Sequence, residues 1–210
     1  MLSQQELEIV RESKTQVLFR RGDSLTKQGA FASYILFVIN GLCKQYIEGY
    51  GGKSYNLRVV QPGEFIGLSG VFTKNIYSYS TVALTDCQAF LVEKGVIANV
   101  IKHNGEFGLN IIKRYCEVNT NLFSKLNTVL YKQMNGRIAE SLLYLDNLKS
   151  AHPDIFQLLS RKDIAEFAAV STESAVKLLK NFEKDGLILL KEKDIVVLKR
   201  DILAEISLKG

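Results

Sequence analysis

The hydrophobic pattern of the chain changes its period near residue 100, and this change limits the possible folds more than any other feature. Before that point the apolar residues form short runs separated by turn residues, whereas after it they recur at three- and four-residue steps. The first pattern is typical of β-strands and the second of amphipathic helices. With 210 residues, 47% of them hydrophobic, the chain can build two modest cores. We therefore predict the α+β class, with a β-rich domain over residues 1–104.

Apolar and β-branched runs mark the strands of this first domain. We predict strands at residues 16–19, 34–39, 42–47, 54–60, 79–84 and 88–92, after a short helix over residues 3–13. Turn residues lie between the runs at Gly22-Asp23, Asn40-Gly41, residues 49–52, Pro62-Gly63, Gly67, Gly70 and Thr85-Asp86. Glycine, asparagine and aspartate tolerate the positive φ angles that tight turns need. Short strands at this spacing indicate a sandwich or barrel of the jelly-roll kind.

A long helix is expected over residues 105–134, which contain no proline. Its narrow apolar seam consists of Leu109, Ile112, Cys116, Leu122, Leu126 and Val129. A long helix with one narrow seam usually pairs with another surface. We expect it to pair with a second copy of the chain; packing on the chain's own β-domain is the alternative, and one helix can do both. Asn135-Gly136 is expected to break this helix before another amphipathic helix over residues 137–148.

The segment from Leu159 to Ile188 predicts two short helices joined by a turn. Ser160 followed by Asp163 is typical of an N-cap with an acidic third residue, and Val170-Ser171 is the predicted turn. Gly186 is expected to end the second helix. The predicted inward-facing residues are Ile164, Ala165 and Ala168 on the first helix and Ala175, Leu178, Leu179 and Phe182 on the second.

The opposite face of the second helix is polar and basic. This pattern indicates a helix-turn-helix whose second helix enters the major groove of double-stranded DNA. Two β runs joined by Lys191-Glu192-Lys193-Asp194 follow, so we predict a winged helix-turn-helix over residues 135–210. Polar residues at the start of the helix would meet bases, and basic residues would meet phosphates. The candidate DNA-binding residues are Arg161, Ser171, Thr172, Glu173, Ser174, Lys177 and Lys180.

Other functional classes find little support in the sequence. The three cysteines form no CxxC pair, and His103 and His152 have no ligand cluster around them, so we expect free thiols, no metal site and no cofactor. The β region has no histidine and no Ser-His-Asp or Cys-His grouping, so we expect no enzyme. The longest apolar run, residues 35–39, is too short to span a bilayer, and residues 1–13 do not resemble a signal peptide. We expect a cytoplasmic protein whose net charge of +5 is compatible with nucleic acid.

On these residues the chain resembles the CRP/FNR family of bacterial transcription regulators over essentially its whole length. Residues 19–44 and 59–72 resemble the family's sensor strands, MNGRIAESLLYL at 134–145 its hinge, and residues 160–188 its DNA-reading head. The resemblance implies a cyclic-nucleotide-binding-type β-roll, a long dimerisation helix and a winged helix-turn-helix. It also implies a homodimer that binds a near-palindromic operator and contacts RNA polymerase. The alternative is a signal-binding β-roll module whose C-terminal helices bind another protein.

The chain departs from the family at the site where some members bind cyclic AMP. Those members carry a glutamate after the glycine of the phosphate cassette and an arginine pair after its loop, whereas this chain has Leu68 and Tyr77-Ser78. A cyclic phosphate would lose its bidentate guanidinium partner, so we expect no response to cyclic AMP. Lys74 is the loop cation that would have to replace it. The effector-pocket candidates are Gly67, Leu68, Val71, Phe72, Tyr77, Ser78 and Tyr79, which either hold a less charged ligand or fill the pocket themselves.

Three further positions differ from the family pattern. Thr172 replaces the first arginine of the recognition helix, Lys177 replaces a later one, and Glu173 is retained. Ala169 replaces the usual turn glycine, which suggests a slightly different turn. The N-terminal cysteine cluster of oxygen-sensing members is absent, and no residue is singled out as a haem ligand.

Overall fold

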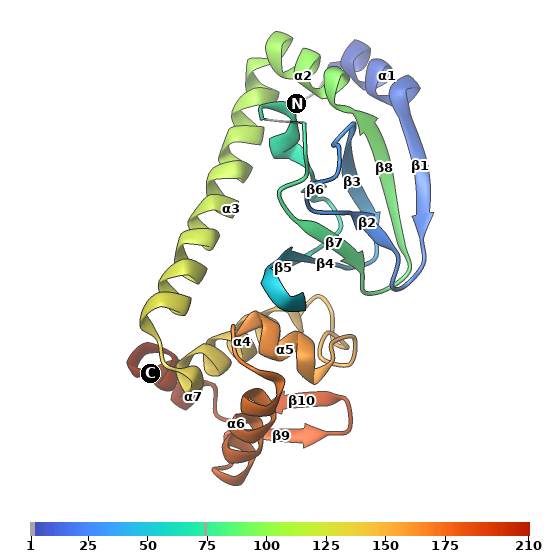
Figure 1. The fold of residues 1–210 in the computed structure, drawn as a ribbon. Helices are drawn as coiled ribbons and strands as arrows, with labels where there is room; N and C mark the ends of the chain where they lie inside the picture. Colours follow the sequence, from blue (N-terminus) through green and yellow to red (C-terminus); the bar gives the residue numbers. More distant parts are fainter. Residues whose placement is uncertain (1–2, 74) are drawn as a thin grey trace. The chain divides into compact units, whose positions relative to one another are not determined.

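A computed structural model describes residues 3–73 and 75–210. The chain forms two compact units, which we call the β unit and the C-terminal unit. The β unit extends to Lys53 and continues over Leu57–Leu122, and the C-terminal unit comprises Ser54–Asn56 and Phe123–Gly210. Figure 1 follows the order of the elements along the chain.

The β unit contains two four-stranded sheets (Figure 1). Their strands are β1 (Lys14–Phe19), β2 (Ser24–Thr26), β3 (Tyr34–Asn40), β4 (Cys43–Glu48), β5 (Ser54–Val60), β6 (Phe65–Ile66), β7 (Ser80–Ala83) and β8 (Cys87–Glu93). One sheet has the order β1-β8-β3-β6 and the other β2-β7-β4-β5. All six predicted strands are present. The structure adds β2 and β6, which have only three and two residues and therefore no readable alternation.

Helices and 3₁₀ turns complete the β unit. They are α1 (Gln4–Ser13), η1 (Tyr50–Gly52), η2 (Leu68–Val71), α2 (Lys94–His103) and the part of α3 (Gly105–Tyr131) up to Leu122; the rest of α3 belongs to the C-terminal unit. The predicted helix α1 begins with a capping box, in which Ser3 and Glu6 bond each other's backbone N–H. The sequence did not predict α2, whereas it did predict the 27-residue helix α3.

Apolar side chains from both sheets form the core of the β unit. Its buried members are Leu36, Val38, Cys43, Val60, Ile66, Ala83, Cys87 and Ala89. On β8, Cys87, Ala89 and the partly buried Leu91 belong to this core, whereas Phe90 and Val92 belong to a second buried cluster. This alternation follows from the two-residue period of a strand, which sends neighbouring side chains to opposite faces.

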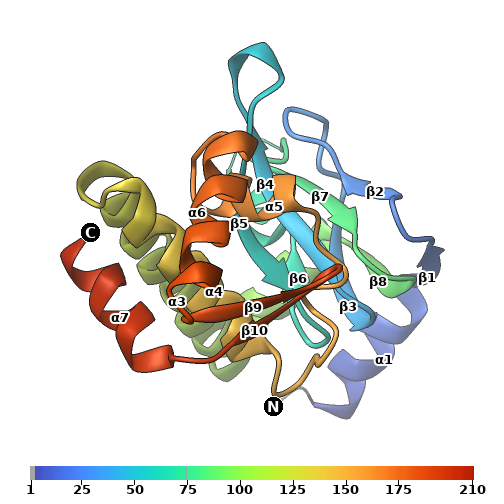
Figure 2. The same ribbon diagram turned by 90° about the horizontal axis from the view of Figure 1, so that it is seen from below.

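The C-terminal unit contains helices and one β-hairpin. Its elements are α4 (Met134–Leu148), α5 (Arg161–Phe167), α6 (Thr172–Lys184), β9 (Ile188–Lys191), β10 (Asp194–Val197) and α7 (Arg200–Lys209). Strands β9 and β10 are antiparallel and lie side by side in both Figure 1 and Figure 2. Two helices followed by this hairpin confirm the predicted winged helix-turn-helix fold.

The expected helix break at Asn135-Gly136 was wrong. Helix α3 ends at Tyr131 and α4 already begins at Met134, so both residues lie in the first turn of α4. Gly136 is buried, and a Cβ atom there would lie 3.0 Å from backbone atoms of Gly210. The glycine therefore permits close packing of the chain's end on α4 and does not form a turn.

Among the described residues, no helix is long and apolar enough to cross a membrane.

Candidate nucleic-acid interface and effector pocket

The first helix of the predicted reading head begins at the cap read from the sequence. The Ser160 side chain accepts a hydrogen bond from the Asp163 N–H at 3.1 Å, and the Asp163 carboxylate accepts from the Ser160 N–H at 2.7 Å. These two bonds use backbone donors that the first turn of a helix leaves free. Ile164, Ala165 and Ala168 are all buried, as the spacing predicted.

The second helix, α6, presents the predicted polar face to solvent. Ser171 caps it and accepts a hydrogen bond from the Ser174 N–H at 3.1 Å. Ala175, Leu179 and Phe182 are buried, and Leu178 is half-buried, so the opposite side faces the core. Five of the candidate DNA-binding residues are exposed, and Ser174 is half-buried: the exposed ones are Ser171, Thr172, Glu173, Lys177 and Lys180. The start of α6 therefore offers hydroxyl, carboxylate and ammonium groups on one accessible surface.

Arg161 is the first residue of α5, and its side chain reaches the hairpin. Its guanidinium donates to the Glu192 carbonyl at 3.3 Å, in the turn between β9 and β10. Partial burial lowers the pKa of Arg161, and the charges of Asp194 and Glu183 oppose this effect. The arginine remains charged because its ordinary pKa is far above neutrality. It links the hairpin to the reading head and supplies positive charge beside it.

The turn between α5 and α6 keeps a left-handed residue although the family's glycine is missing. Ala169 has a φ of 52°. An L-residue with a Cβ atom is strained in this conformation by roughly 1–2 kcal/mol, whereas glycine is not. Ala169 therefore adopts the left-handed conformation that glycine favours. The backbone at Ala169 gives no support to the expectation of a different turn.

The apolar seam of α3 is largely open to solvent in the single chain. Leu109, Ile112, Leu122 and Leu126 are 40–59% exposed, and Cys116 is also exposed. Val129, the sixth seam residue, is half-buried. Phe123 and Leu130 extend the same apolar surface, with 63% and 61% of their surface exposed. Contiguous apolar residues on one helix face mark a surface suited to association.

Two tyrosines close over the glycine of the candidate effector loop. The Tyr79 hydroxyl accepts a hydrogen bond from the Gly67 N–H at 2.8 Å. The Tyr77 ring lies so close that a Cβ atom on Gly67 would be 2.6 Å from it, and the Tyr77 hydroxyl donates to the Tyr34 carbonyl at 2.8 Å. Burial raises the pKa of both tyrosines, which keeps them as neutral phenols. The backbone donor of Gly67 is thus already bonded within the chain.

The remaining loop candidates have different environments. Leu68 packs against the buried cluster of Ile35, Val92 and Ile97. Phe72 and Ser78 are exposed. Val71 lies in η2. Lys74 lies outside the described residues.

An arginine that the sequence reasoning did not single out lies near Tyr79. Arg58 on β5 donates from Nε to the Gln45 side-chain oxygen at 2.8 Å and pairs with Glu64 at 2.5 Å. Burial raises the pKa of Tyr79, and the hydrogen bond from Gly67, the charge of Arg58 and the Gln45 side chain partly oppose this effect. The hydrophobic pattern of the sequence did not indicate that Arg58, Gln45 and Glu64 lie together, because β5, β4 and the turn that holds Glu64 are separate in sequence.

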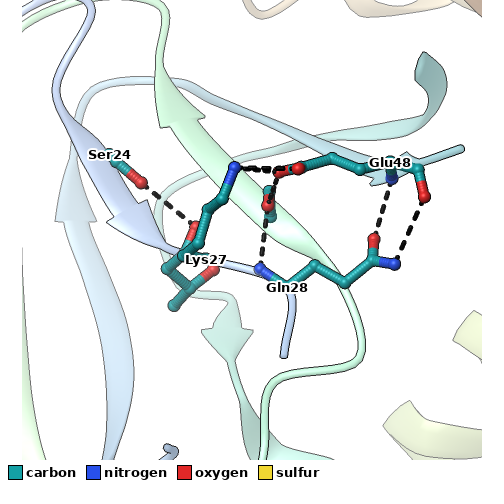
Figure 3. Close-up of polar contacts among 6 residues, drawn as sticks. Ser24, Lys27, Gln28 and Glu48 are labelled. Atoms are coloured by element: carbon teal, nitrogen blue, oxygen red, sulfur yellow. Dashed lines mark hydrogen bonds and ion pairs between the residues drawn. The ribbon is translucent and has the colours of Figure 1, made fainter. Parts of the chain in front are cut away.

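A polar cluster anchors the segment that holds Tyr77 in place. Lys27 donates to both carboxylate oxygens of Glu48 at 2.7 and 2.8 Å, and the Ser80 hydroxyl donates to the same carboxylate at 2.5 Å. Gln28 bonds the Glu48 backbone through its side-chain amide (Figure 3). The pKa of Glu48 is lowered by the hydrogen bonds from Lys27 and Ser80.

The segment after this cluster forms a short ladder with the effector loop. The Gly29 N–H donates to the Tyr77 carbonyl at 2.8 Å, and the Tyr77 N–H donates to the Ala30 carbonyl at 2.9 Å. Tyr77 is therefore fixed through both its backbone and its side chain. Over residues 3–73 and 75–210, no three His, Cys, Asp or Glu side chains are grouped to hold a metal ion.

Two family models match the chain, and together they cover most of it. The model for the cyclic nucleotide-binding domain matches residues 16–104, and the model for the Crp-like helix-turn-helix domain matches residues 136–206. The chain is 26% identical over 178 residues to the cAMP-activated global transcriptional regulator CRP of Salmonella typhimurium, covering 83% of this chain and 85% of that protein. It is 23% identical over 209 residues to the Anaerobic regulatory protein of Bacillus subtilis, covering 97% and 88%.

Solved structures share the fold at low sequence identity. FixK2 from Bradyrhizobium japonicum superposes with a TM-score of 0.80 at 16% identity, over 92% of this chain and 96% of that one. The c-di-GMP responsive global regulator CLP of Xanthomonas campestris gives 0.79 at 19% identity, over 93% and 99%. These similarities confirm the predicted combination of a β-sheet domain, a long helix and a helix-turn-helix.

Proposed function

Because the chain belongs to the CRP/FNR family of bacterial transcription regulators, we propose that it acts as a homodimer on a near-palindromic operator. The observation that carries the proposal is the accessible polar face at the start of α6, supported from behind by a buried apolar face. A helix presented in this way fits the major groove. We divide the chain into a sensor domain (residues 1–104), a dimerisation helix (105–134) and a DNA-binding domain (135–210).

Each side chain of the reading face has an assigned partner on DNA. Glu173 accepts a hydrogen bond from a cytosine amino group, and Lys177 contacts a guanine or a nearby phosphate. Thr172 and the two serines of the first turn contact the backbone or base edges. Lys180 and Arg161 contact phosphates, which adds affinity without sequence preference.

The open seam of α3 supports the homodimer. Two copies of Leu109, Ile112, Cys116, Leu122, Leu126 and Val129 would remove this apolar surface from water. A two-fold axis along the paired helices would repeat the reading head about 34 Å away, one turn of DNA. This geometry is the reason for proposing a near-palindromic site.

We assign no cyclic AMP response to the sensor domain. Tyr79 already bonds the Gly67 N–H, Tyr77 covers the same glycine, and Arg58 is paired with Glu64. An incoming cyclic phosphate would have to break these contacts and would find no arginine at the position of Tyr77. The proposal includes a cytoplasmic location, contact with RNA polymerase, and no catalytic activity.

Mapping the genomic DNA that co-purifies with the protein tests this function. The proposal predicts fragments that share an inverted repeat, with affinity falling steeply as salt rises. The second candidate function, protein binding by the C-terminal helices, predicts instead fragments without a common sequence and no salt-dependent retention of DNA. That result would contradict the proposed function.

A further inference from the structure

Two buried cysteines lie side by side between the sheets of the β unit. The Sγ atoms of Cys43 and Cys87 are 3.6 Å apart, and the two residues are 0% and 1% exposed. Cys43 is the first residue of β4 and Cys87 the first residue of β8, and these strands belong to different sheets. Both are free thiols in the structure. No sequence pattern indicates that these two cysteines form a pair, because 43 residues separate them.

The pair lies where the chain crosses twice between the sheets. Gly41–Leu42 leads from β3 to β4, and Leu84–Asp86 leads back from β7 to β8. The two crossings are joined by hydrogen bonds from the Leu84 N–H to the Leu42 carbonyl at 2.8 Å and from the Leu42 N–H to the Thr85 hydroxyl at 2.9 Å. The thiols are therefore held close by the backbone that surrounds them.

Gly41 packs directly against the Cys87 sulfur. A Cβ atom on Gly41 would lie 2.6 Å from the Cys87 Sγ and 2.3 Å from the Asp86 carbonyl. Gly41 itself is half-buried and follows the exposed Asn40. The Cys87 sulfur thus lies directly beneath a half-buried glycine, and the oxidant that reaches it must be small.

The two thiols have different acidities because of their mutual contact. The Cys43 S–H donates to the Cys87 sulfur and lowers the pKa of Cys87 to about 7, against the effect of burial. The same hydrogen bond, followed by burial, raises the pKa of Cys43. Cys87 is therefore the sulfur that ionises first, and the thiolate is the reactive form of cysteine.

We infer that Cys43 and Cys87 form an oxidation site, which hydrogen peroxide converts into a disulfide joining the two sheets. The Cys87 thiolate attacks a peroxide oxygen, the O–O bond breaks, and the leaving hydroxide takes a proton to become water. The resulting sulfenic acid is attacked by the Cys43 sulfur. The S–S bond forms, the S–O bond breaks, and a second water leaves with the Cys43 proton. In total, two thiols are oxidised and one peroxide is reduced to two waters.

The two sulfur atoms need to move only a short distance to form the disulfide. A disulfide has an S–S length of about 2.05 Å, so the sulfurs must approach each other by about 1.6 Å from their present 3.6 Å. Cys116, on α3, is exposed and far along the chain, so it is not needed for this step. The inference does not depend on the proposed DNA binding, because it concerns the β unit alone.

Thiol counting in a Cys116→Ala variant of the full chain is the direct test. The folded Cys116→Ala variant is treated with hydrogen peroxide and then denatured, and its remaining thiols are titrated. We expect two thiols before treatment and none after, with a monomer on a non-reducing gel, a mass loss of about 2 Da and recovery of both thiols with dithiothreitol. Two thiols that remain titratable would overturn the inference, as would covalent dimers or a gain of oxygen that dithiothreitol does not reverse.

A thermal melt separates a native disulfide from one formed in unfolded chains. Closing the loop between Cys43 and Cys87 should raise the melting temperature of the oxidised variant by roughly 10 °C relative to its reduced form. The Cys43→Ala/Cys116→Ala variant is the matched control: it lacks the partner thiol, so treatment with hydrogen peroxide should not raise its melting temperature. A lower melting temperature for the cross-linked protein would contradict the inference, because the native sheets would then not accommodate the bond.

Discussion

Replacing Leu126 with aspartate should turn the proposed dimer into monomers. Leu126 lies in the α3 seam and is 54% exposed in the single chain. Full burial of a leucine contributes about 1.5–3 kcal/mol, so the exposed half of each copy should contribute about 1 kcal/mol, or about 2 kcal/mol for the pair. Two aspartates facing each other in an apolar seam add the cost of desolvating their charges. Together these effects amount to at least about 4 kcal/mol, which is about a thousandfold in the dimer dissociation constant.

Sedimentation equilibrium measures this change directly. The wild-type protein and the Asn121→Asp variant, which adds the same charge at an exposed position outside the seam, should both sediment as dimers. The Leu126→Asp variant should sediment as a monomer and lose tight binding to a full operator, because only one reading head remains per molecule. A dimeric mass for Leu126→Asp would refute the assignment of the seam to the dimer interface.

Three further predictions follow from single contacts. Ala169→Gly should raise the free energy of unfolding by about 0.5–1 kcal/mol in urea, because it removes the left-handed strain, whereas Ala168→Gly, at a φ of −93°, should lower it. Isothermal calorimetry should detect no micromolar binding of cyclic AMP or cyclic GMP, and micromolar binding that disappears in Lys74→Ala would contradict this. The pKa of Glu48 is lowered from its ordinary value of 4.5, so its stabilising effect is complete above that pH and is lost as the pH falls through the folded-state pKa. In Glu48→Gln, thermal stability should therefore change less between about pH 5 and about pH 3 than in the wild type; equal changes would argue against the role of this carboxylate.

The reading head could be predicted in detail because its signals are local. The caps at Ser160 and Ser171 and the buried positions of α5 and α6 each depend on residues three or four positions away. The long helix α3 was equally visible, because a sustained helical period needs no information from the rest of the chain. The predicted C-terminal boundary of α3 was misplaced, because Asn135-Gly136 was interpreted as a helix break. Gly136 instead allows close packing against Gly210, a contact that local sequence does not reveal.

The effector loop could be predicted only in part, because its contacts are long-range. The loss of the arginine and the presence of Tyr77 and Tyr79 are visible in the sequence. The bonds of Tyr77 to Tyr34 and to the Gly29–Ala30 backbone connect segments more than 40 residues apart, and no periodicity reveals them. Arg58 pairs over shorter separations, with Glu64 and Gln45, but no periodicity reveals these contacts either. Short elements such as β2 and β6 were missed because two or three residues cannot display a period.

The measurement that tests the central claim most directly is selection of preferred DNA sequences by the wild-type protein and by Glu173→Ala. The account predicts that the variant still binds, but accepts other bases at one position of each half-site, with a loss of discrimination of about 1–3 kcal/mol there. Glu117→Ala, which removes an exposed glutamate from α3, should select the same sequences as the wild type. If Glu173→Ala also selected an unchanged sequence with unchanged discrimination, the start of α6 would not be the surface that reads DNA, and the account would be wrong.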